Sequence, residues 1–114
     1  VLPALPDEWH SGHVKGLKAR GGFELAIQWK DNKVKKINIK STIGGNLRLR
    51  SYVPLTGKDL RVAKGVNPNQ LYDSVPGKQP LVSSEAKLNQ PEVRKTYEYD
   101  IMTETGKEYR IYAK

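Results

Sequence analysis

Two adjacent glycines between an arginine and a phenylalanine, in the stretch Arg20-Gly21-Gly22-Phe23, are the first residues whose types could do chemistry. A phosphate-binding loop needs glycines that lead into a helix, because free N–H groups at the helix N-terminus hold the anion. These glycines lead into a strand-like alternation instead, and RNA-binding tracts of this composition repeat the motif many times. We therefore expect Gly21 and Gly22 to form a structural turn with positive φ, and Arg20 to hydrogen-bond across it.

The histidines and acidic residues lack the spacing of a catalytic or metal-binding set. His10 and His13 are three positions apart in a segment rich in turn formers, whereas structural zinc takes four ligands. Glu24, Glu98 and Asp100 fall on the polar faces of expected strands, where a solvated charge is the usual state. We expect no catalytic residue, no metal and no cofactor in this chain.

The tyrosines leave a second type of site open. Tyr52, Tyr72 and Tyr112 fall outside the clearest inward-facing sets of the expected strands. Carbohydrate-binding modules stack sugar rings on exposed aromatic side chains, so each of the three is a candidate sugar contact. Glycan is therefore an alternative partner.

The charge composition invites a nucleic-acid interpretation, because the 114 residues include 20 Lys and Arg against 12 Asp and Glu, for a net charge of +8. Their placement argues against it, since most of the basic residues between 30 and 50 alternate with apolar ones, as on the solvent face of a sheet. The chain has no cysteine, which excludes a disulfide framework. No apolar run is long enough to span a membrane. We expect neither nucleic acid nor membrane as a partner.

Apolar residues at every second position predict most of the secondary structure. The run from Phe23 to Lys30 is joined by a polar turn to a second run that ends at Ser41, which predicts a hairpin. Further strands are expected at 14–19, 47–50, 60–63, 96–103 and 108–113, the last two as a second hairpin. The fold class predicted is all-β, an antiparallel β-sandwich of about seven short strands.

The remaining segments show no sustained period. Residues 64–95 contain four prolines, which predicts a long irregular loop before the last hairpin. Residues 1–13 are expected to be an extended lead segment that comes from a preceding domain, and residues 14–114 a single β-sandwich domain. The chain starts with neither Met nor the pattern of a signal peptide, so we expect it to begin inside a longer polypeptide.

Read as a unit, the first thirty residues resemble a known family. The stretch Leu2-Pro3-Ala4-Leu5-Pro6-Asp7-Glu8-Trp9, then Gly12, the run from Val14 to Glu24, and Trp29 are similar to one junction in glycoside hydrolase family 95, the α-L-fucosidases and relatives. There the helical barrel passes into a C-terminal β domain. The likeness continues through 39–41, 44–45 and 47–50, and residues 64–69 and 87–100 resemble versions of the family from Bacteroides-like bacteria.

The resemblance implies a non-catalytic accessory domain that packs against and stabilises the catalytic helical barrel of the same polypeptide. The whole protein would then be an inverting glycosidase for terminal α-L-fucosyl or related residues, periplasmic or secreted. The catalytic residues of that family belong to the barrel, and none maps onto this chain. The residues expected at the interdomain interface are Leu2, Pro3, Leu5, Pro6, Trp9 and Arg20.

Overall fold

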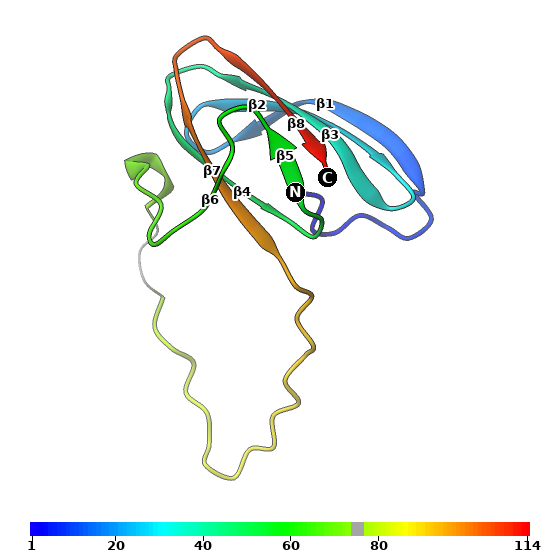
Figure 1. Ribbon diagram of the computed structural model, residues 1–114. Coiled ribbons are helices and arrows are strands. Elements are labelled where there is room, and N and C mark those ends of the chain that lie inside the picture. The colour runs from blue at the N-terminus through cyan, green and yellow to red at the C-terminus, as the bar shows by residue number, and fades with distance from the viewer. Residues whose placement is uncertain (74–76) are drawn as a thin grey trace.

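The computed structural model describes residues 1–73 and 77–114, and within them the chain forms eight strands and one short 3₁₀ helix (Figure 1). The all-β, antiparallel sandwich predicted from the sequence is confirmed. The elements are β1 (Ser11–Ala19), β2 (Phe23–Lys30), β3 (Lys33–Ser41), β4 (Gly45–Ser51), β5 (Leu55–Gly57), β6 (Arg61–Val62), η1 (Gln70–Tyr72), β7 (Tyr97–Thr103) and β8 (Glu108–Ala113).

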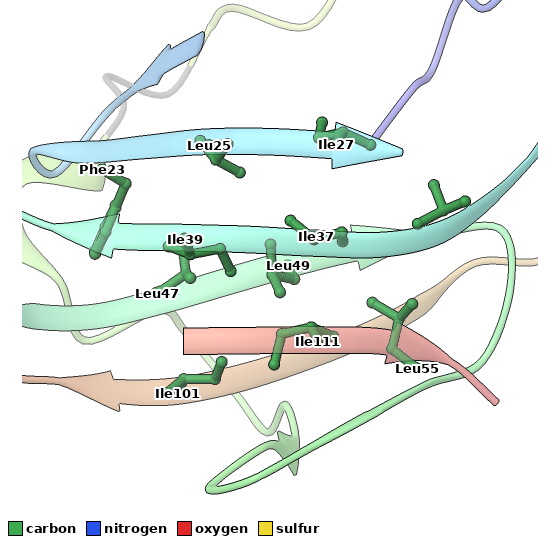
Figure 2. Close-up of a cluster of buried hydrophobic side chains, with 11 residues drawn as sticks. Phe23, Leu25, Ile27, Ile37, Ile39, Leu47, Leu49, Leu55, Ile101 and Ile111 are labelled. Atoms are coloured by element: carbon green, nitrogen blue, oxygen red, sulfur yellow. The ribbon is translucent and has the colours of Figure 1, made fainter. Parts of the chain in front are cut away.

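The strands form a five-stranded sheet, in the order β1-β2-β3-β8-β5, and a three-stranded sheet, in the order β4-β7-β6. Alternate side chains of both sheets meet in one hydrophobic core, which Figure 2 shows. Its members are Phe23, Leu25, Ile27, Val34, Ile37, Ile39, Leu47, Leu49, Leu55, Ile101 and Ile111. The period-two apolar residues that predicted the strands are therefore the ones that the sandwich buries.

The β2–β3 hairpin turns on two residues, Asp31 and Asn32, with φ of 53° and 56°. Positive φ at both central positions matches the right-handed twist of the flanking strands. Beyond the turn, Gln28 pairs with Lys36 and Trp29 with Val34, so β3 carries a bulge at Lys35. The bulge turns Val34 into the core, which simple alternation from Ile37 does not predict.

A second bulge changes β1. This strand begins at Ser11, three positions before the expected start at Val14. Val14 pairs with Ile27 and Leu17 with Leu25, although three positions separate Val14 from Leu17. Gly16, with φ of 76°, supplies the bulged backbone that keeps both side chains on the face of Leu25 and Ile27, where Val14 packs against the core and Leu17 stays exposed.

The expected hairpin of the last two strands is wrong, because β7 and β8 lie in different sheets. β7 pairs with β4 and β6, whereas β8 pairs with β3 and β5. The turn at 104–107 therefore passes from one sheet to the other. Alternation assigns faces to side chains but says nothing about which strand is the hydrogen-bonded neighbour.

In the described parts of the expected loop, residues 64–73 and 77–95, η1 is the one regular element. The residues from 77 to 96 form an excursion that leads away from both sheets, drawn in yellow to orange in Figure 1. The sequence pattern missed β5, which is only three residues long. Three residues contain too few alternating positions to form a clear period, although the even shorter β6 lies within the strand expected at 60–63.

Candidate functional site

The lead segment is fastened to the β2–β3 turn by one residue, Asn32. Its backbone N–H donates to the carbonyl of His10 at 3.0 Å, and its side-chain Nδ2 donates to the carbonyls of Pro6 and Asp7 at 3.2 and 3.0 Å. Its Oδ1 lies 2.9 Å from Nδ1 of His10. Asparagine suits this place because it tolerates positive φ and offers both a donor and an acceptor.

A second anchor comes from Trp29 on β2. Its Nε1 donates to the carbonyl of Trp9 at 2.8 Å, and its ring lies against Gly12, where a Cβ would be only 2.4 Å from Cζ2. The backbone of Trp9 is thus held on the sandwich, while 59% of the residue stays exposed. An indole on a fixed backbone gives a partner a large apolar contact at little cost in conformational entropy.

The expected interface residues of the lead segment divide into two groups. Leu2 packs against the core together with Val1, and Leu5 is half-buried. Pro3, Pro6 and Trp9 are exposed. Of the expected interface residues in the lead segment, only the two prolines and the tryptophan are therefore exposed.

A cavity of about 340 Å³ separates part of the lead segment from the body of the domain. Leu2 and Leu5 line it, as do Tyr52, Arg94 and Lys95. The guanidinium of Arg94 lies 5.9 Å from the centre of the Tyr52 ring, within the range of a cation–π contact. The lead segment and the end of the long loop thus meet at one end of the sandwich.

The glycine pair forms the turn between β1 and β2. Gly21 and Gly22 have φ of 89° and 73°, and a Cβ at Gly22 would lie 2.6 Å from Oγ1 of Thr42. Thr42 donates from that oxygen to the carbonyl of Gly22. Arg20 is exposed, and no side-chain hydrogen bond from it exists among residues 1–73 and 77–114. The expected bond across the corner is therefore wrong, and the corner depends on the glycines and Thr42.

Arg20 also lies apart from the other expected interface residues. It follows the last residue of β1, whereas Trp9 precedes the first, so the length of that strand separates them. A strand of nine residues spans about 30 Å. The structure therefore gathers Pro3, Pro6 and Trp9 at one end of β1 and leaves Arg20 at the other.

The three candidate tyrosines do not form one platform. All are partly exposed, but Tyr52 lines the cavity under the lead segment, Tyr72 lines a separate cleft, and Tyr112 lies on β8. Cations already occupy two of the rings, since Arg94 lies over Tyr52 and Lys36 over Tyr112 at 5.7 Å. Tyr72 is the candidate with no such cation over its ring among the described residues, and polar side chains, including Arg50 and Gln70, line its cleft.

The acidic residues on the strand faces are paired with cations. Glu24 pairs with Lys18, and Glu98 accepts a hydrogen bond from Nε of Arg50 at 2.6 Å. The hydrogen bond from Lys18 lowers the pKa of Glu24. A catalytic acid needs the opposite, a carboxyl pKa raised toward neutral pH, so Glu24 has the chemistry of a structural ion pair.

Arg48 and Asp100, expected to be solvated, form the most shielded of these pairs. Arg48 donates from Nε and Nη2 to the two carboxylate oxygens, both at 2.9 Å, and the side chains are only 13% and 21% exposed. Nη1 of Arg48 also donates to the carbonyl of Gly65 at 2.7 Å. The hydrogen bonds from Arg48, and then from Asn46, lower the pKa of Asp100. The pair ties the start of the long loop to the three-stranded sheet.

No group of three or more His, Cys, Asp or Glu side chains in the described residues could hold a metal ion. His10 is engaged with Asn32 instead. In the same part of the chain, no helix is long and apolar enough to cross a membrane.

Sequence reasoning missed the role of Asn32. Its position in a two-residue hairpin turn was the available signal, because asparagine there indicates positive φ. Nothing in the pattern of residues indicated that its side chain would bind the lead segment, since that contact joins positions 25 and 26 residues apart.

Comparison with known proteins relates the chain to one family and to one longer protein. The family model described as "Glycoside hydrolase family 95, C-terminal domain" matches residues 1–111. "Alpha-L-fucosidase 2" of Arabidopsis thaliana is 43% identical over 42 residues, which are 36% of this chain and 5% of that protein. The matched region is thus a small part of a much longer relative.

We predict that Asn32→Gly frees Pro6 and Asp7 of the lead segment while the turn keeps its conformation, because glycine tolerates positive φ but makes no side-chain bonds. The expected loss is about 1–3 kcal/mol in the free energy of unfolding, measured by urea denaturation. Asp31→Gly is the matched control in the same turn. An equal loss in both variants would contradict the assignment of the clamp to Asn32.

The lowered pKa of Asp100 predicts the direction of a pH effect. Because the folded state favours the carboxylate, the stabilisation is present above the unfolded pKa of about 3.9 and is lost as pH falls through the lower folded value. Asp100→Asn should have a lower free energy of unfolding than the wild type at pH 7. Its free energy of unfolding should also fall less than that of the wild type as the pH is lowered. Urea midpoints between pH 7 and 2 test it, with Glu104→Gln, in an exposed pair with Lys107, as the control. Parallel pH profiles for Asp100→Asn and the wild type would contradict the prediction.

Proposed function

Because the chain belongs to the C-terminal domain family of glycoside hydrolase family 95, we propose that it packs against the catalytic helical barrel of the same polypeptide and stabilises it. The observation that carries this proposal is the exposed indole of Trp9 on a backbone held by Trp29 and Asn32. Aromatic side chains of this kind are typical anchors of protein interfaces. The two exposed prolines beside it enlarge the same apolar surface.

The pairing of the carboxylates supports a non-catalytic role. Glycoside hydrolysis needs one carboxyl that keeps its proton near neutral pH and a second that stays ionised. Glu24, Glu98 and Asp100 each have a cationic partner, and the pKa of Glu24 and of Asp100 is lowered. In the proposed arrangement the reaction belongs to the barrel, and this domain contributes stability.

The proposal extends to the whole protein. The similarity to an α-L-fucosidase supports inverting hydrolysis of terminal α-L-fucosyl or related residues as the activity of the intact polypeptide. The resemblance of residues 64–69 and 87–100 to Bacteroides-like family members supports a bacterial source of that type. We place the intact protein in the periplasm or outside the cell, on the same resemblance.

Carbohydrate binding is the second candidate function, and Tyr72 is the residue that favours it. The residue is 53% exposed and lines a cleft of about 540 Å³ together with Arg50, Asn67 and Gln70. An exposed aromatic ring beside amide and guanidinium groups is a chemistry that suits a sugar. This candidate needs the cleft alone and no contact with a barrel.

Titration of the 114-residue chain with L-fucose and fucosylated oligosaccharides, followed by NMR, separates the two candidates. The accessory-domain proposal predicts no saturable chemical-shift change. Saturable shifts confined to 66–73, and absent in Tyr72→Ala, would establish the second candidate instead. Hydrolysis of nitrophenyl α-L-fucoside by this chain alone would overturn both candidates.

We predict that Trp9→Ala weakens the intact polypeptide but not the isolated chain. Loss of a buried aromatic anchor costs an interface about 2–4 kcal/mol, so the temperature at which the intact protein loses activity should fall. The exposed indole adds little inside this domain, so its own unfolding midpoint should hardly change. Leu71→Ala, which alters an exposed apolar residue on η1, is the control. Equal effects of Trp9→Ala on both proteins would show that the residue serves only its own domain.

A further inference from the structure

The excursion formed by residues 77–96, called the arm below, has the properties of a docking element. It is about twenty residues long and contains no strand or helix. Loops of this length without regular structure are uncommon in compact domains and are usually functional or disordered. The radius of gyration of the chain is 16.5 Å, compared with about 13 Å for a compact domain of this length. The arm thus projects away from the sandwich, as Figure 1 shows.

The tip of the arm is ordered by its own turn. The N–H of Ala86 donates to the carbonyl of Ser83 at 3.0 Å, and the N–H of Glu85 donates to Oγ of Ser83 at 3.3 Å. Large apolar side chains stand just before and just after this turn. Leu81 is fully exposed, and Leu88 is 60% exposed.

The arm exposes large apolar side chains to solvent. Val82 and Val93 are also exposed, which gives the arm four large aliphatic side chains in contact with solvent. Clustered exposed apolar side chains mark interaction sites on soluble proteins. The arm also carries four basic side chains and only two acidic ones, so the surface that receives it should combine apolar sockets with an acidic rim.

The position of the arm indicates which surface it docks on. Arg94 and Lys95, at the returning end, line the same cavity as Leu2, Pro3 and Leu5 of the lead segment. The arm therefore rejoins the sandwich at the end where the lead segment exposes Pro3, Pro6 and Trp9. The chain also matches only 5% of its fucosidase relative, so most of such a polypeptide lies outside this domain.

We propose that the arm docks on the preceding domain of the same polypeptide, with Leu81 and Leu88 in apolar sockets, and forms one continuous interface with the lead segment. This inference rests on the proposed function and adds the second contact to it. The lead segment holds the partner close to the sandwich, and the arm reaches a surface farther from it. Two separated contacts restrict the rotation of one domain against the other more than one contact does.

Amide hydrogen exchange in the intact polypeptide and in the 114-residue chain tests the proposal. Burial of one leucine corresponds to about a tenfold change or more in an equilibrium, so exchange at 80–90 should slow at least that much in the intact polypeptide. The double variant Leu81→Ser/Leu88→Ser should return the arm to within about twofold of its rate in the isolated chain. Protection of the lead segment should persist in that variant.

The matched control is Val66→Ser, which removes an equally exposed aliphatic residue outside the arm and should leave the exchange of the arm unchanged. The melting curve of the 114-residue chain should not change in the double variant, because both leucines face solvent. A slow lead segment combined with a fast arm in the intact polypeptide would overturn this inference and leave the proposed function standing. Fast exchange of both would overturn the two together. Dimers of the isolated chain that the double variant abolishes would assign the arm to a second copy and overturn the inference.

Discussion

The hydrogen bond between the hydroxyls of Ser41 and Thr103, 2.9 Å long, lies in the buried corner where the chain passes between the sheets. Ser41 also exchanges backbone hydrogen bonds with the 104–107 turn, and Thr103 donates from Oγ1 to the carbonyl of Gly45. Two of the connections between the sheets, from β3 to β4 and from β7 to β8, are thereby fastened at one point. Because a buried hydroxyl without a partner is costly, this corner favours the sandwich topology over the simpler hairpin.

The opposite end of the sandwich carries the lead segment and the returning end of the arm. Ser51, the last residue of β4, pairs there with Tyr97, the first residue of β7, and the β2–β3 turn holds the lead segment through Asn32. The arm joins β7 at the same end. The hydrogen-bonded corner at Ser41 and Thr103 thus supports the fold. The opposite end carries the lead segment and the arm, the elements proposed to contact the rest of a family 95 polypeptide.

The Arg48–Asp100 pair is less solvated than the alternation of these strands suggests. The sequence predicted the polar faces of β4 and β7 correctly, but Arg48 and Asp100 become neighbours because β7 pairs with β4. Asn32 is a second example. Its turn was predicted from the sequence, but its contacts with Pro6 and Asp7 were not. Contacts between distant positions depend on strand order, which a local pattern does not contain. Such ion pairs cancel in the net charge, whereas the arm, with four basic and two acidic side chains, holds part of the basic excess.

The amino-acid pattern predicts the class of fold, the faces of β2, β4, β7 and β8 and the glycine turn, because side-chain period and backbone freedom are local properties. Its resemblance to family 95 was also readable, since the junction motif is contiguous. The tertiary structure decided the sheet partners of β7 and β8, the two bulges and the clamp at Asn32. It also decided that the lead segment and the arm share one end of the domain. These features follow from how strands far apart in the chain pack over a common core, and no run of neighbouring residues encodes them.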